Sequence, residues 1–97
     1  MAFFVITCWD KPGALDERLR LRPDHVAYLT SQTSVEILVA GPQLDAEGQM
    51  RGSVFLVQAA DRAAAEAFSA GDPFKQRGVF DKVDISGFTA TMGTWVR

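Results

Sequence analysis

The length of the chain, 97 residues, suffices for one hydrophobic core and not for two, so we expect a single domain over residues 1–97. Hydrophobic residues make up 47% of the sequence and charged residues 23%, a balance typical of a globular protein and not of a disordered one. The net charge of −2, with acidic and basic residues interspersed, lacks the basic stripe that binding to nucleic acid requires.

The single cysteine and the first residues bear on location. Cys8 has no second cysteine to pair with, which favours a reducing compartment. The apolar run over residues 1–9 has no basic leader or cleavage site, and it is far shorter than the ~20 apolar residues that span a bilayer. We therefore expect a cytoplasmic protein with neither nucleic acid nor a membrane as a partner.

The first third of the chain predicts a strand followed by a helix. Residues 3–9 are rich in aromatic and β-branched side chains, and the turn-forming segment DKPG at residues 10–13 ends this strand. From residue 14 the apolar residues recur at helical spacing. Pro23 lies inside this helix and lacks a backbone donor, so we expect it to kink or split the helix.

The rest of the chain predicts two strands, a helix and a last strand. Short β-rich runs at residues 35–40, which Gly41-Pro42 ends, and at residues 53–57 are expected to pair as a hairpin. Asp61 is expected to cap an alanine-rich helix, and a strand follows over residues 79–88. The order β-α-β-β-α-β is that of a ferredoxin-like α+β fold, with a four-stranded antiparallel sheet and two helices on one face.

The strands are apolar on both faces, which bears on assembly. In residues 3–9 both alternating sets of side chains are largely apolar, and the same holds for residues 53–57. Two helices can cover only one face of such a sheet, and a large exposed apolar patch is rare on a monomer. A second copy of the chain is the simplest cover for the other face, so we expect a homodimer. The lining of a pocket is the competing explanation.

His25 is the only histidine in the chain, and histidine is the side chain that ordinarily gains and loses a proton near neutral pH. It lies at the border of the apolar stripe of the first helix, on the same side as Arg18, so it could point into a cleft between helix and sheet. A surface histidine, or one that bonds only to backbone, is the alternative.

Asp72 is the carboxylate that we consider as a partner for His25. It directly precedes Pro73, a position typical of a turn or of a cap for the next helical turn. Its carboxylate could instead accept a hydrogen bond from one imidazole nitrogen, which would fix the tautomer and increase the basicity of the other nitrogen.

The remaining polar residues suggest binding and not metal chemistry. Arg18 and Arg22 could clamp an anionic substrate through bidentate hydrogen bonds, or they could lie on a solvated helix face. Cys8 is more typical of a small core residue than of a nucleophile. One histidine, one strand cysteine and scattered carboxylates do not have the spacing of metal ligands, and no phosphate or dinucleotide motif is present. We therefore expect neither a metal nor a cofactor.

Several short motifs together resemble a known family. The series DKPG at 10–13, Arg18, RPDHVAYL at 22–29, AGP at 40–42, GS at 52–53, DPF at 72–74 and GVF at 78–80 closely resembles the YciI-like family. The resemblance covers about residues 3–88 and leaves residues 89–97 as a tail that could cross to a partner subunit or fray. It implies a ferredoxin-like fold assembled as a dimeric α+β barrel, with relatives among muconolactone isomerase-like enzymes. By motif position it also implies a catalytic pair at His25 and Asp72.

The resemblance also implies a kind of chemistry, since some YciI-like proteins are similar to dehydrochlorinases that act on chlorinated hydroquinones. We expect a lyase or isomerase in which His25, oriented by Asp72, moves a proton on a small aromatic or enol-like substrate. Tyr28, Phe74 and Phe80 are expected as apolar walls, and Arg18, Arg22 and Ser53 as groups that bind the substrate or steady its negative charge. The alternative is a non-catalytic binding or accessory module in which His25 only holds a ligand.

Overall fold

The computed structural model describes residues 2–96, so Met1 and Arg97, the ends of the expected domain and tail, lie outside the described residues. The elements in chain order are β1 (Ala2–Asp10), α1 (Leu15–Ser31), β2 (Glu36–Leu44), β3 (Met50–Ala59), α2 (Arg62–Gly71), α3 (Pro73–Gln76) and β4 (Phe80–Phe88). The expected β-α-β-β-α-β order is confirmed, with the short helix α3 as an addition.

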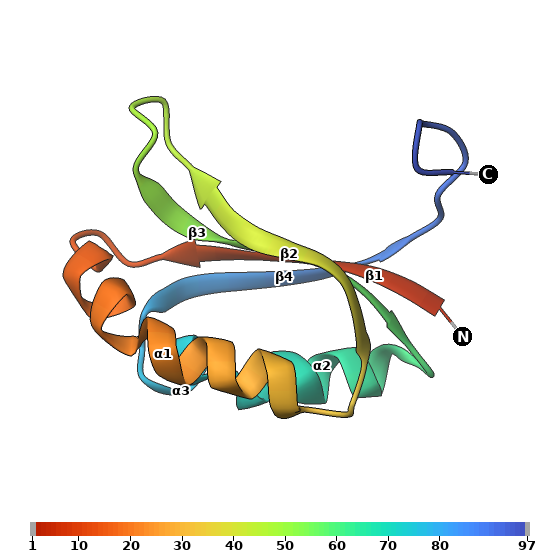
Figure 1. Cartoon of the computed structure of the whole chain (residues 1–97), viewed down its shortest axis with the longest axis horizontal. Helices are drawn as coiled ribbons and strands as arrows, with labels where there is room; N and C mark the ends of the chain where they lie inside the picture. Colours follow the sequence, from red (N-terminus) through yellow and green to blue (C-terminus); the bar gives the residue numbers. More distant parts are fainter. Residues whose placement is uncertain (1, 97) are drawn as a thin grey trace.

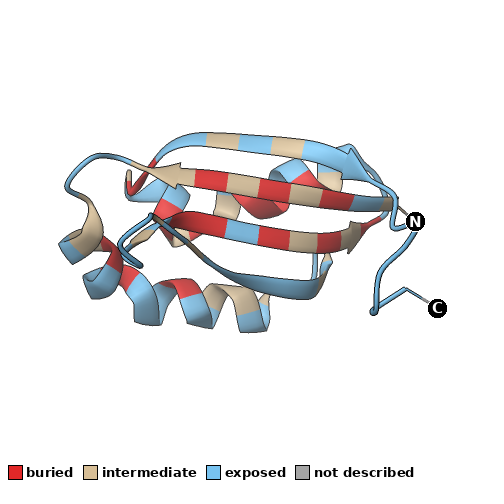
Figure 2. Ribbon diagram, turned by 90° about the horizontal axis from the view of Figure 1, so that it is seen from above, coloured by how far each residue is buried: buried red, intermediate tan, exposed pale blue. Residues whose placement is uncertain are grey.

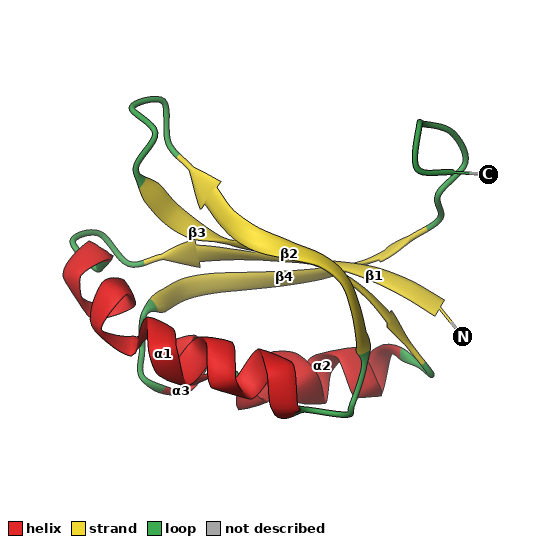
Figure 3. Ribbon diagram, viewed as in Figure 1, coloured by secondary structure: helices red, strands yellow, loops and turns green. Residues whose placement is uncertain are grey.

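The strands form one four-stranded sheet in the order β2-β3-β1-β4. The sheet and the helices make two separate layers (Figure 3). All neighbouring pairs are antiparallel, and β1 pairs along most of its length with both β3 and β4. The three helices lie together against one face of this sheet (Figure 1). The arrangement is ferredoxin-like, as the sequence predicted.

The core lies between the sheet and the helices. Along β1 the alternate residues Phe4, Ile6 and Cys8 are buried, and β3 shows the same alternation (Figure 2). Phe68 of α2 and Phe74 of α3 are almost fully buried against these strands. Side chains alternate between the two faces of a strand, so this face is the one that the helices cover.

Two expectations about proline are corrected by the structure. Pro23 does not split α1, which is one helix of 17 residues, because buried side chains on both sides of the proline, Leu21 and His25, hold the helix to the core. Strand β2 does not end at Gly41-Pro42 but continues to Leu44. It is an edge strand, and proline is tolerated there because its missing N–H can fall on the side of the strand that has no neighbouring strand.

Aspartate side chains cap the two later helices. Asp61 accepts a hydrogen bond from the backbone N–H of Ala64 at 2.9 Å and so caps α2, as expected. Asp72 accepts from the N–H of Phe74 at 2.9 Å and caps α3, a helix of four residues in which Pro73 occupies the first turn. This short helix fixes the side chains of Asp72 and Phe74 relative to each other.

The other face of the sheet is apolar and open. Phe3, Val39, Val54 and Phe88 are between 37% and 45% exposed on strands that pair side by side. Beyond β4, residues 89–96 form neither helix nor strand, and they leave the sheet on the side away from the helices (Figure 1). Within residues 2–96, no helix combines the length and the hydropathy needed to cross a membrane.

Candidate active site

A cavity of about 250 Å³ lies between α1 and the sheet. Helix α1 supplies Arg18, Arg22, His25, Val26 and Leu29, strand β2 supplies Ala40, Gly41 and Pro42, strand β3 supplies Met50, Ser53 and Phe55, and α3 supplies Phe74. Most of the lining is apolar, and its polar groups are two guanidinium groups, one imidazole and one hydroxyl. Such a mixture is typical of a pocket for a small organic molecule.

His25 and Asp72 meet at the edge of this cavity, although they are 47 positions apart in the sequence. The Nδ1 atom of His25 lies 2.8 Å from Oδ1 of Asp72, and the two side chains are only 11% and 2% exposed. An ionised carboxylate can only accept, so Nδ1 carries the proton and donates it. No hydrogen bond within residues 2–96 engages Nε2, which leaves this nitrogen as an acceptor for a ligand in the cavity.

Phe74 fixes the plane of the imidazole. Its ring stacks on that of His25, with centroids 4.0 Å apart and planes 10° apart. Since Asp72 accepts from the N–H of Phe74 as well as from His25, one carboxylate oxygen positions both rings. The guanidinium of Arg18 also lies over the Phe74 ring, with Cζ 4.6 Å from the ring centroid.

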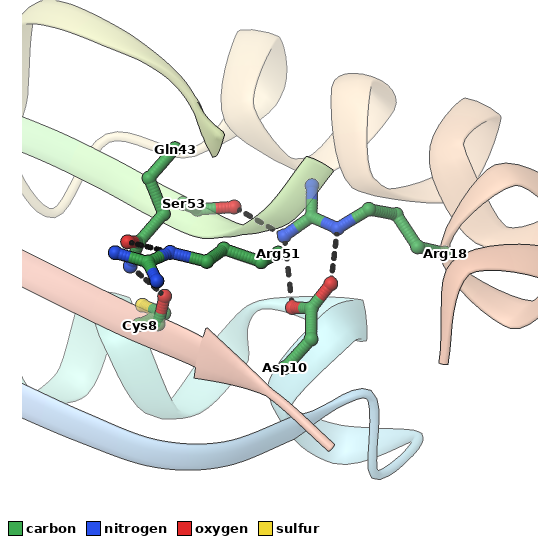
Figure 4. Close-up of polar contacts among 6 residues, drawn as sticks. All are labelled: Cys8, Asp10, Arg18, Gln43, Arg51 and Ser53. Atoms are coloured by element: carbon green, nitrogen blue, oxygen red, sulfur yellow. Dashed lines mark hydrogen bonds and ion pairs between the residues drawn. The ribbon is translucent and has the colours of Figure 1, made fainter. Parts of the chain in front are cut away.

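Arg18 is buried and held by three hydrogen bonds (Figure 4). Its Nε and Nη2 donate to the two carboxylate oxygens of Asp10 at 2.7 and 3.1 Å, and Nη2 also donates to Oγ of Ser53 at 2.8 Å. The expected alternative of a solvated helix face is therefore wrong for Arg18. Its bidentate fork is occupied by Asp10, and only Nη1 has no partner within the described chain.

The glycine before Ser53 has a packing role. A Cβ atom at Gly52 would lie 2.0 Å from the carbonyl oxygen of Cys8, which is closer than atoms can approach. The space is used by Gln43, whose amide donates to that carbonyl at 2.8 Å (Figure 4). Gly52 thus lets β2 and β1 interact across β3 beside the Arg18–Asp10 pair.

The structure brings five of the eight sequence-predicted site residues to the cavity lining: Arg18, Arg22, His25, Ser53 and Phe74. Asp72 lies directly behind His25. Tyr28 and Phe80 do not line it. The hydroxyl of Tyr28 donates to the carbonyl of Phe68 at 2.9 Å, and Phe80 is buried edge-on against Phe74.

Sequence reasoning missed Asp10 as a functional residue. It stands in the DKPG turn segment, and its partner Arg18 follows eight positions later in another element, so no single helix or strand period relates the two. Both positions belong to the series of motifs that carries the family resemblance, which was the available signal. Met50 and Phe55 also line the cavity without having been singled out.

Two weakly acidic side chains near the site, those of Cys8 and Tyr28, have raised pKa values. Burial, followed by the negative charge of Asp72, raises the pKa of the Cys8 thiol to about 12. The same two causes, burial first, raise the pKa of Tyr28 above its ordinary value. Within residues 2–96, no group of three metal-ligating side chains is close enough to hold an ion, and independence from metals stays a prediction.

The fold and this site together define a small ferredoxin-like protein with a histidine–aspartate pair at a cavity. The chain belongs to the YCII-related family, whose domain matches residues 2–89. An uncharacterised protein of Haemophilus influenzae is 31% identical over 93 residues, covering 89% of this chain and 95% of its own. Protein YciI of Escherichia coli is 29% identical over 92 residues, covering 88% and 94%.

Solved structures of similar shape include one of known activity. This is 5-chloro-2-hydroxyhydroquinone dehydrochlorinase (TftG) of Burkholderia phenoliruptrix in complex with 2,5-dihydroxybenzoquinone, which is 29% identical with a TM-score of 0.83 over 92% of this chain and 95% of that one. An antibiotic biosynthesis monooxygenase is 19% identical with a TM-score of 0.56, covering 95% and 100%, and supports the fold alone.

Proposed function

We propose that this protein is a small enzyme in which His25, oriented by Asp72, transfers a proton on a single-ring hydroxylated substrate, as a dehydrochlorinase-like lyase or an isomerase. The observation that carries the proposal is the 2.8 Å contact between Nδ1 of His25 and Oδ1 of Asp72, with Nε2 left at the cavity. A carboxylate that holds one imidazole nitrogen makes the other a directed base.

The cavity supports a substrate of about this size. Its volume of about 250 Å³ suits one substituted ring. Phe55 and Phe74 supply flat apolar surface, while Ser53 and Nη1 of Arg18 can donate to a substrate oxygen. Similarity to TftG, which acts on a chlorinated hydroquinone, supports the same class of substrate.

The loss of HCl from such a ring requires only one base in the enzyme, which is His25. Nε2 of His25 first accepts the proton of a ring hydroxyl and returns it to the carbon that bears chlorine, which converts the enol to its keto form. Chloride then leaves with the electron pair of the C–Cl bond, while a second hydroxyl loses its proton and becomes a carbonyl. The products are a quinone and HCl, and no external oxidant is consumed.

We also propose that the enzyme is a homodimer of the α+β barrel type, in which a second copy covers the open sheet face. Apolar side chains on all four strands of that face support this assembly. At about 25 cal/mol per Å², burial of several hundred Å² supplies on the order of 10 kcal/mol before the entropy of association is subtracted. A cytoplasmic location and the absence of nucleic-acid partners stay predictions.

The proposal is tested by chloride release from 5-chloro-2-hydroxyhydroquinone under argon, which prevents autoxidation. We expect turnover by the unaltered protein, with losses of about 10²–10⁴-fold in His25→Ala and in Asp72→Asn. Asp24→Asn is the matched control, because it makes the same substitution at an exposed residue of α1. Binding of the ring without chloride release, or release that survives His25→Ala, would instead favour a binding module.

A further inference from the structure

The charge of the cavity lining differs from that of the chain as a whole. The chain has a net charge of −2, yet two arginines and no aspartate or glutamate line the cavity. The carboxylates of Asp10 and Asp72 are not part of the lining, and each is engaged by a lining residue, Arg18 and His25 respectively. The cavity therefore presents positive charge to whatever enters it.

The two arginines are not equivalent. Arg18 is paired at 2.7 Å with Asp10, both side chains are 5% exposed, and its charge is neutralised at close range. For Arg22, no carboxylate within residues 2–96 lies within the 4.0 Å of an ion pair, and its side chain is exposed at the cavity. Arg22 precedes His25 by three residues on α1, so the two side chains project from the same side of the helix.

We propose that the substrate binds as an oxyanion, a ring enolate or phenolate, whose charge is balanced by Arg22, while Nη1 of Arg18 donates one hydrogen bond to it. The inference rests on the proposed function, and it names the ionisation state of the substrate. An oxyanion bound beside the guanidinium of Arg22 places the negative end of the ring at one end of the cavity and leaves Nε2 of His25 to a different position on the ring.

The ionised form also suits the chemistry. A ring oxyanion pushes electron density onto the ring carbon that bears chlorine. Nε2 of His25 takes a proton from another ring hydroxyl and delivers it to that carbon, and the oxyanion then becomes a carbonyl as chloride leaves. Arg22 therefore selects the reactive form of the substrate, whereas Arg18 and Asp10 fix the shape of the site. A neutral ring of the same size would fill the cavity without engaging the unpaired guanidinium.

Isothermal titration calorimetry with two ligands of similar size tests whether Arg22 recognises the charge of the ligand. The first is 2,5-dihydroxybenzoquinone, a vinylogous acid that is an anion at neutral pH, and the second is hydroquinone, which is neutral. We expect Arg22→Gln to weaken binding of the anion by about tenfold or more and to leave binding of hydroquinone unchanged. Arg20→Gln is the control, because Arg20 lies on the same helix, pairs with Glu17 and does not line the cavity.

The anion should also bind more weakly as sodium chloride is raised from about 50 to 500 mM, because screening weakens an exposed ion pair. Equal loss of both ligands in Arg22→Gln, or no loss of either, would overturn the inference. Chloride release decides the proposed function separately. Turnover that requires His25 but not Arg22 would support the proposed function and refute the role of Arg22. Binding that depends on Arg22 and on the ligand's charge, without turnover, would support the role of Arg22 and refute the proposed function.

Discussion

Replacement of Asp10 by asparagine tests whether the buried ion pair holds the site in shape. The change keeps the size of the side chain but removes the charge that neutralises Arg18, and both side chains are only 5% exposed. A guanidinium that stays buried without its counter-charge costs about 3–5 kcal/mol. The amide oxygen of asparagine can still accept one of the two hydrogen bonds, so we expect a loss near the lower end, about 3 kcal/mol of unfolding free energy.

That loss corresponds to a fall in the melting temperature of roughly 12–24 °C for a domain of this size. Urea unfolding at one fixed protein concentration gives the free energy, provided that the slope with urea is unchanged. Asp81→Asn, a change of the same kind at an exposed residue of β4, is the control and should stay within about 0.5 kcal/mol of the unaltered protein.

A double-mutant cycle separates the pair from its surroundings. Arg18→Met alone leaves Asp10 buried and unpaired, whereas the double variant Asp10→Asn/Arg18→Met buries no charge there. We therefore expect the double variant to lose at least about 1 kcal/mol less than the sum of the single losses. Additive losses, or an Asp10→Asn variant as stable as Asp81→Asn, would refute the reasoning that the pair is a buried and coupled unit.

Three further predictions concern other parts of the fold. Gly52→Ala should lower the free energy of unfolding by about 2 kcal/mol or more, since its Cβ would lie 2.0 Å from a backbone oxygen. Gly87→Ala is the control, because a Cβ there meets nothing within 4 Å, and urea unfolding measures both variants. Cys8 should resist alkylation at about pH 8 until the protein unfolds, and because its pKa rises from 9.0 to about 12 on folding, stability should fall as pH rises between those values. Sedimentation at micromolar concentration should give twice the chain mass, and a stable monomer would rule out the barrel dimer.

The layers of the fold could be predicted because local patterns agreed with the final packing. The alternation of Phe4, Ile6 and Cys8 reappears as burial in β1, and Asp61 caps α2 as its position indicated. At two prolines the local sequence preference did not predict the structure. Pro23 is overridden by the buried residues around it, and Pro42 is accommodated because β2 lies at the sheet edge, which only the strand order reveals.

The candidate site was predictable in part, and the reason lies in how its members are spaced. His25 could be singled out by its chemistry, but its contact with Asp72 joins residues 47 positions apart and was anticipated only from the family resemblance. The pairing of Arg18 with Asp10 depends on where the end of a strand meets a helix, so the periodicity of hydrophobic residues could not predict it. The exclusion of Tyr28 from the cavity depends on an acceptor on α2 that the sequence does not place.

The geometry of His25 can be observed directly, because the chain contains one histidine and its ring nitrogens give a single set of NMR signals. Long-range ¹⁵N–¹H spectra at about pH 9, where an imidazole is ordinarily neutral, distinguish the nitrogen that carries hydrogen from the one that does not. The control for Asp72→Asn is again Asp24→Asn, which leaves the hydrogen bond to Nδ1 in place.

If Asp72 orients the base, the spectrum of the unaltered protein and of Asp24→Asn will show hydrogen on Nδ1 and a bare Nε2, and Asp72→Asn will lose this preference. Addition of 2,5-dihydroxybenzoquinone will then shift the Nε2 signal, since His25 lines the cavity and its Nδ1 is engaged by Asp72. Hydrogen on Nε2 in the unaltered protein, or a spectrum that Asp72→Asn leaves unchanged, would contradict the claim that His25 and Asp72 form a directed base.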